Sequence, residues 1–249
     1  MPQSRLIVLS GPSGVGKTPL DTSLYKFFPE IRNHLRKIVL YNSRKPRPGE
    51  KDNRDYHFRS RKYLNQLRKN NDYIVIDVRG DTQALNLIEL TQLLENHRVL
   101  FEGNTCIAIE ILKRFKSNLK TGLLSIFLSP LSKIEIQLIQ KFKGRTNLHH
   151  LITTLMYNKL ERRLRTYGTT LSSDRRENLN VRSKEAYFEL KNAWRFDWVI
   201  PNHDGEDSDN WRIMPYPIGD ARISLHTFVD IIQKGYSENA EKWEKNLIP

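Results

Sequence analysis

The stretch that decides the fold is Gly11-Pro12-Ser13-Gly14-Val15-Gly16-Lys17-Thr18, which follows an apolar run at residues 5–10. The run predicts a buried strand, and residues 17–28 predict the helix that comes after it. The spacing G-x-x-x-x-G-K-[ST] is that of a P-loop, whose glycines let successive backbone N–H groups point at phosphate oxygens. A helix N-terminus adds a partial positive charge. The order of strand, loop and helix favours a phosphate cradle over a chance glycine turn.

All eight residues of this loop are expected to line a nucleotide site. Lys17 is expected to reach the β- and γ-phosphates, and the Thr18 hydroxyl is expected to hold Mg²⁺. Pro19 falls in the first helical turn, where a missing N–H costs little.

Composition sets the class of protein. The chain has 249 residues, of which 38% are hydrophobic and 28% charged, as in an ordinary globular domain. Its single cysteine, Cys106, forbids an internal disulfide and fits a reducing compartment. No apolar run approaches the length of a membrane span, and the P-loop begins at residue 11. We therefore expect no membrane segment, no cleavable signal and a cytoplasmic location.

The positive charge is concentrated in two segments. Of the net charge of +13, residues 32–69 contribute +10 and residues 141–184 contribute +8, which leaves −5 for the remainder. Two basic segments can converge on a polyanionic ligand, form solvated faces, or make a nucleic-acid surface. Composition alone leaves these three interpretations open.

A second informative stretch, Ser43-Arg44-Lys45-Pro46-Arg47-Pro48-Gly49-Glu50, is followed by Asp55-Tyr56-His57-Phe58. Its prolines and glycine forbid a regular helix and predict a shaped loop. The guanidinium groups of Arg44 and Arg47 suit a bound phosphate, and Tyr56 offers a hydroxyl to the same oxygens. Ordinary surface arginines are the alternative.

The P-loop followed by S-R-x-P-R-P-G-E and D-Y-H-F resembles the guanylate kinase family. In that family the second motif binds the nucleoside monophosphate. The resemblance therefore implies that Arg44, Arg47 and Tyr56 hold the phosphate of the acceptor nucleotide. It is strong for residues 5–60 and patchier beyond them.

The resemblance also implies that the base-reading positions have changed. Counted from Tyr56, the family's guanine-contacting glutamate falls near Val75 and its second tyrosine near Ala84. The family's serine, four residues before Arg44, falls at Leu40. Phosphate capture is therefore expected to be retained and base reading to be altered. The nearby acids Asp77 and Asp81 are candidates for a substitute.

Residues 98–104 read as a central strand with an acid at its carboxyl end, where α/β sheets place ligand chemistry. By resemblance, Glu102 stands where the family has its acid near Mg²⁺ and the acceptor. Asn104 stands where the family has a second aspartate that meets guanine, and an amide cannot offer a carboxylate to paired N–H donors. For Glu102, a solvent-facing acid is the alternative.

The second basic segment resembles the family's lid, which closes over ATP with arginines. Arg162, Arg163 and Arg165 cannot all face inward, because positions i, i+1 and i+3 spread around a helix. Arg182 is the best match to the family's second lid arginine, and with Lys17 and Arg44 it is expected to be catalytic. By resemblance, Asn202 lies beside the base of ATP.

The expected architecture is a three-layer α/β domain of the P-loop NTPase type at residues 1–234, with a parallel sheet. Its core would comprise residues 1–33, 98–140 and 185–234, its monophosphate-binding segment residues 34–97, and its lid residues 141–184. Residues 203–219 are expected to form an inserted loop, residues 220–234 a closing helix and residues 235–249 a frayed tail.

The resemblance implies ATP-dependent, Mg²⁺-assisted phosphoryl transfer to a nucleoside monophosphate, GMP or dGMP, by a monomer or homodimer. One alternative is a kinase for another phosphomonoester, such as a sugar phosphate. A second is a non-catalytic binding module of the same fold, against which the intact Gly16-Lys17-Thr18 argues. A third, an ATPase or kinase directed at nucleic acid, is favoured by charge alone.

Overall fold

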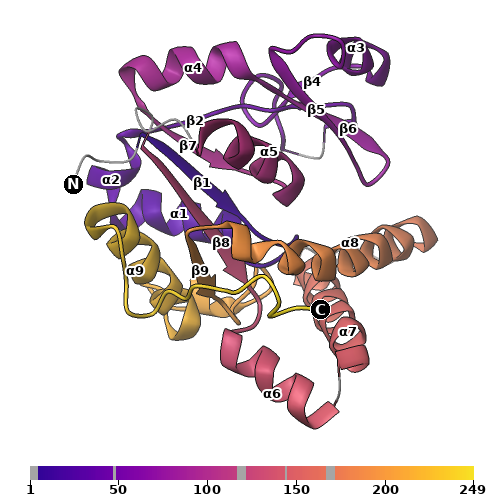
Figure 1. The fold of residues 1–249 in the computed structure, drawn as a ribbon, viewed down its shortest axis with the longest axis vertical. Helices are drawn as coiled ribbons and strands as arrows, with labels where there is room; N and C mark the ends of the chain where they lie inside the picture. The colour runs from indigo at the N-terminus through magenta and orange to yellow at the C-terminus, as the bar shows by residue number, and fades with distance from the viewer. Residues whose placement is uncertain (1–4, 47–48, 117–121, 144, 167–171) are drawn as a thin grey trace.

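A five-stranded parallel sheet forms the centre of the computed structural model, which describes residues 5–46, 49–116, 122–143, 145–166 and 172–249 (Figure 1). The central strand pairs with a neighbour on each side, and the order is β2-β7-β1-β8-β9. These strands are β1 (Leu6–Ser10), β2 (Leu35–Lys37), β7 (Arg98–Glu102), β8 (Leu123–Ser129) and β9 (Trp198–Pro201).

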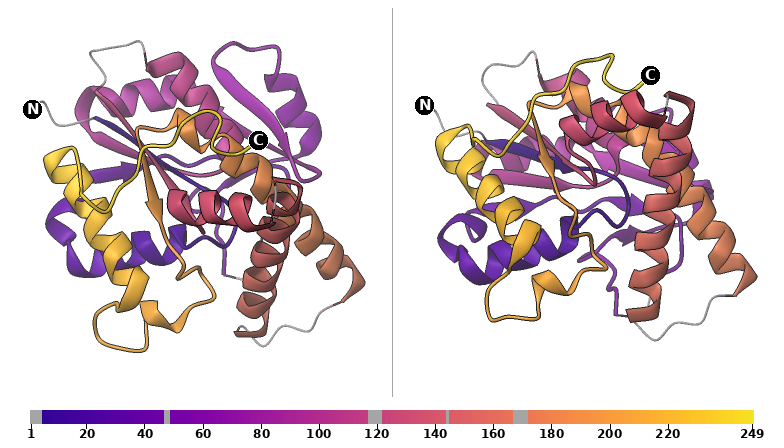
Figure 2. Two further views of the ribbon diagram at one scale, coloured as in Figure 1. Left: turned by 60° about the horizontal axis from the view of Figure 1, so that its bottom comes forward. Right: turned by 90° about the horizontal axis from the view of Figure 1, so that it is seen from below.

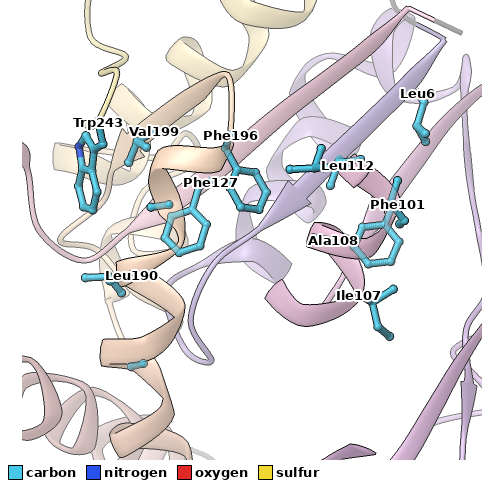
Figure 3. Close-up of a cluster of buried hydrophobic side chains, with 14 of the residues drawn as sticks. Leu6, Phe101, Ile107, Ala108, Leu112, Phe127, Leu190, Phe196, Val199 and Trp243 are labelled. Atoms are coloured by element: carbon cyan, nitrogen blue, oxygen red, sulfur yellow. The ribbon is translucent and has the colours of Figure 1, made fainter. Parts of the chain in front are cut away.

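Helices cover both faces of this sheet, because both faces of its strands are apolar. Ile7 and Leu9 of β1 point to the side of α1 (Lys17–Phe27) and α9 (Gly219–Lys234). Leu6 and Val8 point to the other side, where α5 (Thr105–Phe115) and α8 (Ser173–Lys191) pack (Figure 3). Alternation of side chains along the strand therefore builds two hydrophobic cores. The predicted three-layer arrangement is confirmed.

The segment between α1 and β7 forms a second, four-stranded sheet (Figure 1). Its order is β4-β3-β6-β5, and β5 and β6 form an antiparallel hairpin. The short helix α2 (Pro29–Arg32) precedes this segment, and α4 (Leu87–Asn96) returns the chain to β7. The elements are β3 (Tyr41–Asn42), β4 (His57–Phe58), α3 (Arg61–Leu67), β5 (Tyr73–Val78) and β6 (Asp81–Asn86).

Two long helices make up most of the segment expected to form the lid. Helix α7 (Arg145–Thr166) follows α6 (Lys133–Lys143), and α7 packs along α8 (Figures 1 and 2). Helix α8 starts at Ser173, inside the range expected for the lid, and continues to Lys191, inside the range expected for the core. This pair of helices carries the second basic segment to the edge of the parallel sheet where the P-loop lies.

The last fifteen residues pack on the domain, so the expectation of a frayed tail is wrong (Figure 2). The backbone of Glu241 pairs with that of Val199 in β9, with both N···O distances at 2.8 Å. Trp243, Leu247 and Ile248 are buried in the same core as α5 and α8. Burial of three large apolar side chains outweighs the entropy that normally frees a chain end.

The predicted inserted loop is an ordered segment with one 3₁₀ turn, η2 (Asp209–Trp211). A second 3₁₀ turn, η1 (Ala193–Arg195), joins α8 to β9. The carboxylate of Asp204 organises the loop by accepting hydrogen bonds from Ser208, Asn210 and the backbone of Ala221. Among the helices of the described ranges, none has the length and apolarity needed to cross a bilayer.

Candidate active site

The P-loop takes the backbone conformation that its glycines allow. Gly11 and Gly16 have φ values of 144° and 108°, which other residues rarely adopt. A Cβ atom at Gly11 would lie 2.4 Å from the carbonyl oxygen of Leu128, and one at Gly16 would lie 2.5 Å from Nδ2 of Asn202. The loop therefore needs glycine at both positions for conformation and for space.

Lys17 begins α1 at the floor of a cleft. Its Nζ donates hydrogen bonds to the carbonyl oxygens of Gly11 and Pro12, at 2.6 and 2.8 Å. Burial lowers the pKa of Lys17, an effect that the nearby carboxylates of Glu206, Glu189 and Glu102 oppose. A charged lysine held by uncharged carbonyls is suited to take an anion in their place.

Asn202 lies behind the loop. Its side chain is fully buried, and Nδ2 donates to the carbonyl oxygens of Val15 at 2.7 Å and of Asp204 at 2.9 Å. Asn202 is not among the residues that line the cleft. Its side chain therefore holds the P-loop against the 203–219 segment, and its expected place beside the base of ATP stays a prediction.

Arg44 and Tyr56 enter the cleft from the second sheet. The guanidinium of Arg44 lies 5.0 Å from the ring centre of Tyr56 and makes a two-pronged ion pair with Glu50, at 2.6 and 2.7 Å. Only 16% of the Arg44 side chain is exposed. The carboxylate fixes the plane of the guanidinium fork. Arg47 lies outside the described residues.

The carboxyl end of β7 supplies Glu102 and Asn104, both of which line the cleft. Glu102 forms an ion pair with Lys37 at 2.5 Å. Asn104 caps α5, because its Oδ1 accepts the N–H of Cys106 at 2.7 Å. This commits the amide oxygen of Asn104 to the helix and leaves its NH₂ group as the part that can meet a ligand.

Two arginines reach the cleft from the helix pair. Arg182 on α8 donates from Nε to the hydroxyl of Ser13 in the P-loop, at 3.0 Å. Arg163 on α7 lines the same cleft and pairs with Glu206, whereas Arg162 pairs with Asp207. Arg165 pairs with Glu161 and has 69% of its side chain exposed. The predicted spread of these arginines around the helix is therefore confirmed.

Sequence reasoning missed Arg163 as the inward-facing member of its group. It also missed Asn178 and Glu206, which line the cleft, and Arg79. A helical period alone cannot fix which side of a lone basic helix faces inward, because the period leaves the rotation of the helix open. No motif marks Glu206, which reaches the site only through the fold of the 203–219 segment.

A buried network joins the second sheet to α8. Arg79 at the tip of the β5–β6 hairpin pairs with Glu185 and, at 3.0 Å, with Glu189 of α8. Glu189 is 7% exposed and also accepts a hydrogen bond from Thr105 at 2.8 Å. Burial raises the pKa of Glu189, and the positive charges of Arg79 and Lys17 oppose that rise.

The three positions reached by counting from Tyr56 and Arg44 lie away from the cleft. Val75 and Ala84 stand opposite each other in the hairpin, on the face shared with Asp77. Arg68 of α3 pairs with Asp77 at 2.6 Å, so this face is directed toward α3. Leu40 belongs to the hydrophobic core. None of Val75, Ala84 and Leu40 lines the cleft.

The pairing of the hairpin explains why Ala84 points away from the cleft. The turn at Arg79-Gly80, where both residues have positive φ, sets the pairing of the hairpin. A shift by one residue exchanges the two faces of a strand, and a count from a distant tyrosine cannot detect it. Asp81 and Gln83, on the opposite face from Ala84, are the β6 residues that line the cleft.

The oxygen donors of the cleft fit Mg²⁺. This ion needs only one or two protein oxygens, since phosphates and water complete its octahedron. The exposed Thr18 hydroxyl and the Glu102 carboxylate lie in the same cleft. Within the described ranges, no cluster of three or more histidine, cysteine, aspartate or glutamate residues suggests a different metal.

The fold and the cleft together define a P-loop protein of the nucleotide kinase type, in which two basic segments face one phosphate cradle. Comparisons with known proteins agree with this class. A family model described as guanylate kinase matches residues 3–167. The chain belongs to the guanylate kinase family.

Relatives and solved structures lie within the same family. The chain is 31% identical over 201 residues to a guanylate kinase of Rickettsia felis, an alignment that covers 80% of this chain and 85% of the relative. It is 32% identical over 203 residues to one of Nitratidesulfovibrio vulgaris, covering 81% and 80%. The crystal structure of guanylate kinase from Anaplasma phagocytophilum shares the fold, with a TM-score of 0.53 at 17% identity over 96% of this chain and 89% of that one.

Proposed function

We propose that this chain transfers the γ-phosphoryl group of ATP to the phosphate of GMP or dGMP. An oxygen of the acceptor phosphate forms the new bond to the γ-phosphorus, and the bond from that phosphorus to the β–γ bridging oxygen breaks, which releases ADP. The reaction needs positioning and charge neutralisation more than covalent chemistry from the protein.

The observation that carries the proposal is the meeting of three cationic groups in one cleft. Lys17 comes from the P-loop, Arg44 from the second sheet and Arg182 from α8. The loop amides and Lys17 would hold the donor phosphates, and Arg44 and Tyr56 the acceptor phosphate. Arg182, with Arg163, would neutralise the transferring group.

The chain's own residues fit the expected cofactor. Thr18 would supply a hydroxyl to Mg²⁺, and Glu102 would orient water in its coordination shell. The ion, when bound, withdraws charge from the phosphate oxygens. Arg47, by family resemblance, would add to the acceptor phosphate. The proposed partners are these nucleotides, and the proposed location is the cytoplasm.

The test is an ADP-release assay with ATP and Mg²⁺ across GMP, dGMP, AMP, CMP, UMP and ribose phosphates. We expect turnover with GMP and dGMP that exceeds turnover with every other acceptor, and a blank rate from Lys17→Ala. Turnover only with a ribose phosphate would replace GMP by that acceptor. Undiminished activity of Lys17→Ala would remove the P-loop from the reaction.

A further inference from the structure

The inner face of the β5–β6 hairpin changes character along its length. Ile74 and Leu85, which pair with each other, are buried in the hydrophobic core. On the same face, Gln83 stands opposite Ile76 two pairs further on, and Asp81 stands opposite Val78 four pairs further on. Gln83 and Asp81 line the cleft. One face of the hairpin therefore runs from the core to the nucleotide site and ends in two polar side chains.

These side chains are free to bind a ligand. Within the described part of the chain, the carboxylate of Asp81 has neither a hydrogen bond nor an ion pair, and the Gln83 amide also makes no side-chain hydrogen bond. By contrast, Asp77 on the other face is engaged by Thr82 and Arg68. Asp81 thus differs from Glu102, Glu189 and Glu206, the other described carboxylates of the cleft, each of which forms an ion pair.

Asn42 adds a third polar group to the same patch. It pairs with Gln83 across the β3–β6 contact and is buried at the wall of the cleft. Its Oδ1 accepts the backbone N–H of Arg44 at 3.1 Å, which leaves its NH₂ group as a donor. The patch thus offers the amide NH₂ groups of Asn42 and Gln83 as donors beside the Asp81 carboxylate, which can accept two hydrogen bonds.

We propose that Asp81 is the specificity-determining residue for guanine, with Gln83 and Asn42 as its neighbours in the base-reading patch. This inference rests on the proposed function. Guanine presents two adjacent donors, N1–H and the N2 amino group, next to the O6 acceptor. A carboxylate can accept both donors at once, and an amide NH₂ can donate to O6.

The same chemistry disfavours other bases. Adenine places a lone pair at N1, which the carboxylate would repel, and xanthine replaces the N2 amino group by a carbonyl oxygen. Asp81 would therefore select guanine both by binding it and by repelling adenine and xanthine. In this chain the acid comes from β6, one residue from the closing turn of the hairpin.

The test compares GMP with XMP as acceptors for the wild type and for Asp81→Asn. The new amide keeps an acceptor for N1–H but presents a donor where guanine also has one, so kcat/KM for GMP should fall by about 10- to 100-fold. The same donor suits the carbonyl of xanthine, so the ratio of XMP to GMP turnover should rise by at least about tenfold. KM for ATP should stay within about twofold.

Asp77→Asn is the matched control, because it makes the same change on the same hairpin but on the α3 face. It should leave both acceptor constants within about twofold. Asp81→Ser is a second variant and should use GMP and IMP at similar rates, since IMP lacks only the N2 amino group. Urea unfolding of each variant separates lost folding from lost recognition.

The outcomes are distinct. A wild type that phosphorylates GMP, together with an unchanged XMP to GMP ratio in Asp81→Asn, overturns the role of Asp81 and leaves the proposed function intact. A wild type without GMP turnover overturns both. A shifted ratio in Asp81→Asn with none in Asp77→Asn supports the assignment.

Discussion

The structure holds the side chains of Arg44 and Lys17 in two different ways before a phosphate binds. Arg44 is held flat by the two oxygens of Glu50 and stacked against Tyr56, so its plane is fixed before an anion arrives. Lys17 is held by two uncharged carbonyl oxygens, and its pKa is lowered by burial. An arriving phosphate would therefore raise the pKa of Lys17.

Removal of Arg44 should affect one substrate and spare the other. We expect Arg44→Ala to raise KM for GMP by about 10- to 100-fold, because hydrogen bonds to a charged group contribute about 1.5–3 kcal/mol. KM for ATP should change by less than about threefold, since the P-loop lies on a different segment. Steady-state titration of each substrate at saturation of the other measures both constants. Equal losses for both would contradict the assignment.

At the residue scale, the sequence predicted those site residues that sit in fixed motifs. The motif residues that line the cleft are Gly11, Ser13, Gly14, Lys17, Thr18, Arg44 and Tyr56, because each motif shapes its own backbone. Pro12, Val15 and Gly16 of the same loop are buried and do not line it. Asn202 and Val75 do not line the cleft, and their surroundings depend on contacts with distant segments that the sequence does not show. Asp81 could be named as a candidate, but only the strand pairing separates it from Asp77.

The β5–β6 hairpin and α8 form the contact through which the acceptor side meets the lid side. Arg79 is 19% exposed and supplies the positive charge that Glu189 needs in its buried position. Its φ of 55° places it at a turn where few residues other than glycine, asparagine or aspartate are common. The conformational cost of Arg79 at this position is offset by two ion pairs across the elements.

Loss of this ion pair should destabilise the fold. We expect Arg79→Ala to lower the free energy of unfolding by about 3–5 kcal/mol, because Glu189 is left as an unpaired buried charge. The double variant Arg79→Ala with Glu189→Gln should recover part of that loss, since position 189 then carries no unpaired carboxylate. Urea unfolding measures both. Arg61→Ala, an exposed neighbour that pairs with Asp77, is the control and should cost under about 1 kcal/mol.

His203 joins three elements at the end of β9. Its ring lies between Glu135 near the start of α6 and Asp220 in the first turn of α9. Burial alone would lower the pKa of His203, but the hydrogen bonds to these two carboxylates outweigh it and raise the pKa above 6.5. The charged ring is therefore the form that the folded protein favours.

The pH dependence of stability follows from that direction. A raised pKa stabilises the fold below pH 6.5, and the contribution is lost as the pH rises through the folded-state value. Because His203 is partly exposed, the loss in free energy of unfolding should be about 1 kcal/mol or less. Urea unfolding at pH 6 and pH 8 should show this loss in the wild type and a smaller one in His203→Gln. Equal losses in both proteins would contradict the role of His203.

Over the whole molecule, the two cores and the parallel sheet follow from the alternation of apolar residues in β1, β7 and β8. The sequence therefore predicted the layers. It failed at the last fifteen residues, where one tryptophan and two aliphatic side chains lie between polar neighbours without helical or strand period. Their burial depends on the surface that β9, α6 and α8 present to them.

The tail should matter for stability as much as an internal core segment does. We expect Trp243→Ala to lower the free energy of unfolding by about 3–5 kcal/mol, because a large buried side chain is lost. Glu238→Ala, an exposed position in the same segment, should change it by less than about 0.5 kcal/mol. Urea unfolding of both variants checks this. A small loss in Trp243→Ala would mean that the tail packs loosely.

The bridge from Arg79 to α8 has a thermodynamic consequence. Helix α8 carries both Glu189, which pairs with Arg79 of the β5–β6 hairpin, and Arg182, which donates a hydrogen bond to Ser13 of the P-loop. If GMP binds more tightly when α8 makes both contacts, then GMP binding favours the arrangement in which ATP also binds, and the same holds in reverse. Linkage then requires reciprocity: the factor by which GMP tightens ATP is the factor by which ATP tightens GMP.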